Sequence, residues 1–188
     1  MPDDRPSSHN LLDLAPPDIA WFQERSDLIL IPIGSCEQHG AHLPLGTDTI
    51  TALEVSRRAA EKADVPYAPP FWAGYSPQHM REPETGVGTI TLRADTFTEL
   101  LYDIARSLIH HGWNKLVFVN GHGSNTKVID PLLRRIKYET GAFVESLRTA
   151  LRPDIPFEAV DAHVDDPDFA ELVADRYLTL LEEPAHAG

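Results

Sequence analysis

The chain has 188 residues, of which 42% are hydrophobic and 24% are charged, values typical of one soluble globular domain with its own core. Its net charge of −13 argues against binding to nucleic acid or to an anionic membrane surface. No apolar run reaches transmembrane length, and the polar N-terminus lacks the features of a signal peptide. Cys36 is the only cysteine, which excludes an internal disulfide and favours a cytoplasmic setting.

The first part of the chain predicts a short helix, a buried strand and a longer helix. Pro16-Pro17 followed by Asp18 marks the start of the short helix. Residues 28–33 form a mostly apolar run rich in branched side chains, as expected of a strand that is covered on both faces. Residues 49–63 place small and apolar side chains on one side of a helix, with Thr47 or Asp48 as the candidate N-cap.

The rest of the chain continues the alternation of strands and helices. Short strands are predicted over residues 65–71, 89–92, 116–119 and 141–146, and a long loop over residues 72–88. A capping box at residues 96–99 opens a helix that Gly112 closes. Further helices are predicted after Asn125 and over residues 167–181. This alternation predicts an α/β domain with a mainly parallel sheet.

The first motif, residues 34–48, follows the first predicted strand and is rich in metal-binding residue types. Glu37 and His39 are two residues apart, so in an extended chain both side chains can face one pocket. Glycines and a proline then allow the chain to turn and bring Asp48 back to the same point. A carboxylate can bridge two cations, so Asp48 could serve a paired site. The alternatives are a polar loop with incidental acids, and a role for Asp48 only as a helix cap.

The second motif, Asn-Gly-His-Gly-Ser-Asn at residues 120–125, repeats this architecture after the strand predicted at 116–119. Two glycines around His122 allow the backbone to approach a ligand closely. The alternative is a polar strand-to-helix turn in which Asn125 is merely a cap. Ligands of parallel sheets bind beyond the carboxyl ends of the strands, where both motifs lie. We therefore predict that the two motifs converge around shared cations.

Together the two motifs resemble the creatininase (creatinine amidohydrolase) family. The resemblance rests on Gly-Ser-Cys-Glu-Gln-His-Gly at residues 34–40, Leu-Pro-Leu-Gly-Thr-Asp at 43–48 and the second motif, and Gly-Tyr-Ser-Pro-Gln-His at 74–79 resembles the family's substrate loop. It implies a three-layer α/β/α fold with a mainly parallel sheet. It also implies a metal-dependent hydrolase that cleaves a C–N bond of a cyclic or linear amide with a metal-activated water.

The resemblance also implies the roles of individual residues. The metal ligands would be Glu37, His39, Asp48 and His122, with Asp48 bridging a pair of divalent ions, zinc or manganese. The proton-shuttling catalytic residue would be His186. Residues expected at the substrate are Tyr75, Ser76, His79 and Ser124. The expected partner is a small-molecule amide, and the expected assembly is a homo-oligomer, either a hexamer or one of its subassemblies.

The sequence departs from the family pattern at the last carboxylate ligand. Ser124 stands where creatininase has a glutamate, and members with a serine or glycine there are expected to use a glutamate just after a His-Ala-Gly sequence. His-Ala-Gly closes this sequence at Gly188, so residues 1–188 are predicted to form a single creatininase-like domain without the family's C-terminal part. A second ion would then be weakly held, unless another acid such as Glu82 or Glu84 replaces the missing one.

Two other functions remain open from the sequence. The missing carboxylate favours a non-catalytic or impaired metal-binding member of the same fold. A different metal-dependent hydrolase, which opens a lactone or a sugar-acid ring, is the second alternative. A phosphoester hydrolase is disfavoured, because neither motif has an arginine or lysine near it until Lys127.

Overall fold

A computed structural model describes residues 5–81 and 86–147 of the chain. Its sheet has three parallel strands in the order β1-β2-β3. The strands are β1 (Leu28–Ile33), β2 (Lys115–Asn120) and β3 (Phe143–Leu147). The α-helices are α1 (Pro16–Gln23), α2 (Thr47–Ala63), α3 (Ala94–His110) and α4 (Thr126–Thr140), and the short 3-10 helices are η1 (Leu11–Asp13), η2 (Pro77–Arg81) and η3 (Gly123–Asn125). The helix predicted over residues 167–181 lies outside the described residues.

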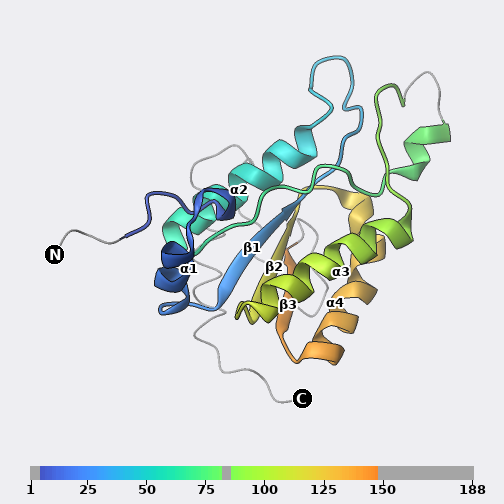
Figure 1. Ribbon diagram of the computed structural model, residues 1–188. Coiled ribbons are helices and arrows are strands. Elements are labelled where there is room, and N and C mark those ends of the chain that lie inside the picture. Colours follow the sequence, from blue (N-terminus) through green and yellow to red (C-terminus); the bar gives the residue numbers. More distant parts are fainter. Residues whose placement is uncertain (1–4, 82–85, 148–188) are drawn as a thin grey trace, which may run out of the picture.

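The described elements form three layers, with the sheet between two layers of helices (Figure 1). Alternate side chains of β1 point to opposite faces, and all six residues of this strand are buried. Ile29 and Ile31 belong to the core cluster that includes side chains of α3 and α4. Leu28 and Leu30 belong to a second cluster, which includes side chains of α2. The predicted α/β/α architecture with a parallel sheet is therefore confirmed.

The strand predicted over residues 65–71 is not a regular strand. This segment runs beside β1 and makes only isolated bridges to it, at Tyr67 and Phe71. Backbone hydrogen bonds do join the two, among them Ala68 N to Leu30 O at 2.8 Å. The prolines at 66, 69 and 70 have no N–H to donate, so a continuous ladder cannot form. The strand predicted over residues 89–92 is likewise reduced to one bridge between Ile90 and Cys36.

Two predicted helix starts are wrong, by three residues for α3 and by two for α2. Helix α3 begins at Ala94, so Thr96 lies inside its first turn and does not cap it. Helix α2 begins at Thr47, which places Asp48 in the first turn rather than at the N-cap. A carboxylate in the first turn is stabilised by the positive end of the helix dipole. The alternative in which Asp48 serves only as the helix cap is thus wrong, and its carboxylate remains available for other contacts.

The register of the sheet sets the two motifs side by side. Ile33 at the end of β1 pairs with Asn120 at the end of β2. The next residue, Gly121, donates its backbone N–H to Ile33 O at 2.9 Å. Both motifs therefore leave the sheet at the same edge, as parallel strands require. No helix in the described part of the chain is both long and apolar enough to cross a membrane.

Candidate metal centre

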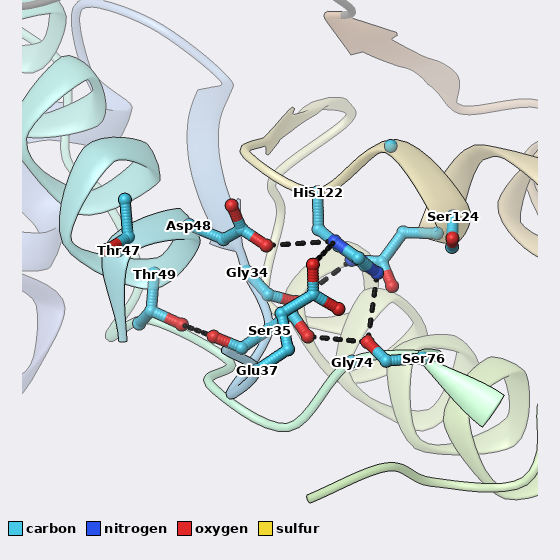
Figure 2. Close-up of polar contacts among 12 residues, drawn as sticks. Gly34, Ser35, Glu37, Thr47, Asp48, Thr49, Gly74, Ser76, His122 and Ser124 are labelled. Atoms are coloured by element: carbon cyan, nitrogen blue, oxygen red, sulfur yellow. Dashed lines mark hydrogen bonds and ion pairs between the residues drawn. The ribbon is translucent and has the colours of Figure 1, made fainter. Parts of the chain in front are cut away.

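Side chains of the two motifs converge at the carboxyl edge of the sheet (Figure 2). Glu37, His39 and Asp48 each offer one ligand atom, and these atoms all lie within 4.8 Å of one another. His122 approaches from the second motif, with its Nδ1 2.8 Å from Asp48 Oδ2 and 3.4 Å from Glu37 Oε1. The predicted convergence of the two motifs is therefore present in the fold. Metal ligation by these four side chains stays a prediction.

Local hydrogen bonds fix which nitrogen of each imidazole faces the carboxylates. His39 Nδ1 lies 3.1 Å from the carbonyl oxygen of Glu37, and its Nε2 lies 3.0 Å from Asp48 Oδ1. A carbonyl can only accept a hydrogen bond, so Nδ1 is the nitrogen that donates to it, and Nε2 is the nitrogen turned toward the Asp48 carboxylate. His122 uses the opposite nitrogens, because its Nε2 lies 3.2 Å from the Tyr75 carbonyl oxygen. In both rings one nitrogen is thus engaged by a backbone carbonyl and the other faces the carboxylates, which is the orientation that a metal ligand needs.

Buried oxygens without partners support a cation at this place. The Glu37 side chain is only 9% exposed, and its Oε2 has no hydrogen-bond partner among the described residues. The contact between Asp48 Oδ2 and His122 Nδ1 is short but is not aligned as a hydrogen bond. Buried carboxylate oxygens are costly unless a hydrogen bond, an opposite charge or a metal satisfies them. The donor set of imidazoles and carboxylates suits zinc or manganese.

The raised pKa of His122 agrees with a site that attracts a cation. Burial by itself lowers the pKa of the imidazole. The contact with Asp48 and the charges of Glu37 and Asp48 outweigh burial and raise the pKa of His122 above its ordinary value. The two carboxylates therefore attract positive charge to the nitrogen that faces them. A divalent ion placed there would meet the same attraction.

A pair of buried hydroxyl groups supports His122 from behind. The Ser76 hydroxyl lies 3.0 Å from His122 Nε2 and 2.7 Å from the Ser35 hydroxyl. Both serines are fully buried, with 0% of their surface exposed. This position favours a role for Ser76 in orienting the imidazole rather than in touching a substrate. Sequence reasoning assigned no role to Ser35, because nothing in the spacing of the first motif marks its contact with a loop 41 residues away.

Close backbone packing holds the two motifs at a fixed distance. A Cβ atom added to Gly121 would lie 2.2 Å from the carbonyl oxygen of Asp48, so only glycine fits there. The Asn125 side chain donates to Gly34 O at 3.0 Å and accepts from Tyr75 N at 2.9 Å. Asn125 is the N-cap residue of α4 by position, but its side chain makes no cap bond, so the alternative in which it is merely a cap is wrong. It ties both motifs to the loop that carries Ser76.

The other residues predicted at the substrate lie around the centre in different ways. Tyr75 and Ser124 line an open cavity of about 390 Å³. The remaining lining residues are Pro77, Gln78, Arg81 and Lys127. Gln78 donates a 2.8 Å hydrogen bond to the Ser124 hydroxyl. His79 points toward the carboxylate of Glu37, with 3.6 Å between its Nε2 and Glu37 Oε2. A substrate contact for any of these residues stays a prediction.

Three residues named in the sequence analysis cannot be placed. His186, the predicted proton shuttle, lies outside the described residues. Glu82 and Glu84, the acids considered as replacements for the missing carboxylate, also lie outside them.

Comparisons with known proteins give the relatives of this chain. The family model described as "Creatininase: Creatinine amidohydrolase" matches residues 13–188. A mycofactocin precursor peptide peptidase of Mycobacterium ulcerans is 38% identical over 120 residues, which are 59% of this chain and 46% of that protein. The chain thus spans about half the length of the curated relatives it matches.

Solved structures of creatininases share the fold. One, a mutant creatininase described as Zn-Zn type, has a TM-score of 0.65 and 29% identity, with 76% of this chain and 58% of that chain covered. Another, described as "Creatininase Mn", has a TM-score of 0.62 and 27% identity, with 74% of this chain and 58% of that chain covered.

Proposed function

This chain belongs to the creatininase family, and from that premise we propose that it is a metal-dependent amidohydrolase that hydrolyses a C–N bond of an amide. The observation that carries the proposal is the convergence of two carboxylates and two imidazoles, with buried carboxylate oxygens that accept no hydrogen bond from the described residues. The whole protein's activity is part of the proposal, because the matched part of the chain covers only 46% of that relative's length.

Zinc or manganese is the proposed cofactor. Such an ion supplies a Lewis acid that activates water and polarises the carbonyl oxygen. Glu37 and Asp48 contribute the negative charge that holds a divalent ion, and His39 and His122 contribute lone pairs fixed by backbone carbonyls. The two oxygens of Asp48 face different imidazoles, Oδ1 facing His39 and Oδ2 facing His122. This arrangement supports Asp48 as the residue shared by a pair of ions. The naming of similar structures as Zn-Zn and Mn forms supports the choice of ions.

The cavity beside the centre suggests which amides to examine first. Arg81 and Lys127 line it, and neither makes an ion pair with a carboxylate in the described part of the chain. Two cations on one cavity favour a substrate with a carboxylate. We therefore propose carboxylate-bearing amides, including peptides, as the first substrates to screen. The similarity to a peptide peptidase supports the same choice.

The test compares metal content and hydrolysis in three variants. His39→Ala and Asp48→Ala each remove a proposed ligand, whereas His42→Ala removes an exposed imidazole from the same loop and serves as the control. We expect bound zinc or manganese, measured by mass spectrometry after dialysis, to fall in the first two variants and to stay unchanged in the third. Hydrolysis of a panel of linear and cyclic amides should follow the metal content.

Two outcomes separate this proposal from its alternatives. Unchanged metal content in both His39→Ala and Asp48→Ala would refute the metal centre. Metal binding by the wild type without turnover of any amide, with or without added zinc or manganese, would favour the non-catalytic member of the family. Turnover of lactones but not of amides would favour ring opening of a lactone or sugar acid.

A further inference from the structure

His79 extends the centre by one more imidazole. Its Nε2 lies 3.6 Å from Glu37 Oε2, while the other oxygen of Glu37 faces His122 Nδ1 at 3.4 Å. Asp48 divides its two oxygens between His39 and His122 in the same way. Imidazoles and carboxylates therefore alternate along a chain of pairwise contacts. The side chains in this chain of contacts, in order, are His39, Asp48, His122, Glu37 and His79.

The spacing between His79 and Glu37 suits two ligands of one ion better than a direct bond. A hydrogen bond between these groups would be about 2.7–3.2 Å long, and Glu37 Oε2 makes none within the described ranges. Two ligands that each lie about 2.0–2.2 Å from a tetrahedral zinc ion stand about 3.3–3.6 Å apart. Both contacts of Glu37, at 3.4 and 3.6 Å, fall in this range. The carboxylate is thus placed to share a cation with either imidazole.

The turn that carries His79 is tied to both motifs through the residues just before His79. Ser76, just before the 3-10 helix η2, bonds to His122 and Ser35, and its carbonyl accepts the backbone N–H of His79 at 3.3 Å. Gln78 bonds to Ser124 in the second motif. His79 is itself only partly buried, with 24% of its side chain exposed. These ties place the backbone of His79 beside the centre, and the imidazole keeps one side open to solvent, from which an ion could enter.

From this geometry we propose that His79 is a further metal ligand, which binds through Nε2 an ion that it shares with Glu37. The proposal rests on the proposed function, because it requires that the centre hold a divalent ion at all. It makes an imidazole of the loop at residues 74–79 part of the metal centre rather than of the substrate surface alone. No carboxylate beyond Glu37 and Asp48 is then needed to hold the ion on this side.

Cobalt gives a direct count of histidine ligands in the 188-residue chain. The ring N–H of each imidazole bound to Co²⁺ gives a strongly shifted, exchangeable proton signal in the NMR spectrum. We expect three such signals in the wild type, from His39, His79 and His122, and two in His79→Gln. Titration with Co²⁺ should show that His79→Gln weakens the binding of one ion by more than about 10-fold. Loss of a residue that only orients a ligand starts at about 10-fold.

A matched variant excludes a purely structural explanation. Gln78→Ala releases the same turn from Ser124 but keeps the His79 imidazole, so it should retain all three signals. Two signals in the wild type, unchanged in His79→Gln, would overturn the role of His79 and leave the proposed function standing. A wild type that binds no Co²⁺ would overturn both. If Gln78→Ala lost the same signal and affinity as His79→Gln, the effect would be one of turn geometry and the ligand assignment would fail.

Discussion

The two motifs meet at one centre, but the fold holds them in different ways. The first motif places Glu37 and His39 on a long loop, whose residues 41–45 are exposed, and Asp48 in the first turn of the helix that follows it. The second motif places His122 in a short turn, with buried Asn120 and Asn125 on either side. The first motif thus carries most of the proposed ligands, and the second provides a rigid reference point for them. Two motifs that each follow a strand thus differ in how many proposed ligands they carry and in how firmly the surrounding residues hold them.

The largest expected effect, on the free energy of unfolding, comes from adding a methyl group where the backbones of the two motifs touch. Gly121→Ala would place a methyl group 2.2 Å from the backbone carbonyl oxygen of Asp48, which cannot move as a side chain can. Gly123→Ala, on the other side of His122, meets nothing within 4 Å. We expect the first variant to lower the free energy of unfolding by about 3 kcal/mol or more and the second by less than about 1 kcal/mol. Urea unfolding of the metal-free proteins measures both.

Equal stability of these two glycine variants would contradict the comparison, since it would mean that the second motif does not fix the position of Asp48.

A smaller effect, on the affinity for zinc, is expected from removing the Ser76 hydroxyl that contacts His122. Ser76→Ala removes the 3.0 Å contact to Nε2 but leaves the Tyr75 carbonyl to hold the same proton. We expect zinc affinity, measured by calorimetric titration, to fall about 10-fold, the low end of the range for residues that orient a ligand. Ser107→Ala, whose hydroxyl bonds only to its own helix α3, is the control and should leave the affinity unchanged. Unaltered affinity in both variants would show that His122 needs no support from this side.

The smallest effect, on the free energy of unfolding, is expected from a charged side chain near the middle of α2. Bonds from Arg57, together with those from Arg58, lower the pKa of Glu54 in α2 to about 2, although burial opposes this. A lowered pKa stabilises the fold above the unfolded value of 4.5, and this stability is lost as the pH falls toward 2. Because the Glu54 side chain is 42% exposed, solvent screening limits the gain to about 0.5 kcal/mol.

Denaturant unfolding of Glu54→Gln and the wild type at several pH values measures this gain. The difference between the two proteins should be present at pH 7 and shrink as the pH falls below about 4. A difference that grew at low pH would show that the ion pairs of Glu54 do not stabilise the folded state.

The sequence predicted elements well where the hydrophobic pattern is local. The strand over residues 28–33 has the predicted bounds, because all its side chains are apolar and both faces are covered. The segment at residues 65–71 failed as a strand, because prolines removed the donors that its pattern assumed. The start of α3 failed because a capping box was present in the sequence but the helix had already begun at Ala94. Side-chain patterns thus predicted which segments pack into the core. They predicted less well where the backbone hydrogen bonds of a helix or a strand begin.

The sequence by itself determined the residue types of the centre, since Glu37, His39 and Asp48 lie within one short motif and their spacing is a local property. Only the tertiary structure decided which atoms face one another. The contact of His122 with Asp48 depends on the parallel register of β1 and β2, and those of Ser76 and His79 depend on where a separate loop packs. Such contacts join residues more than 40 positions apart, and their geometry is set by the packed sheet rather than by any repeat along the chain.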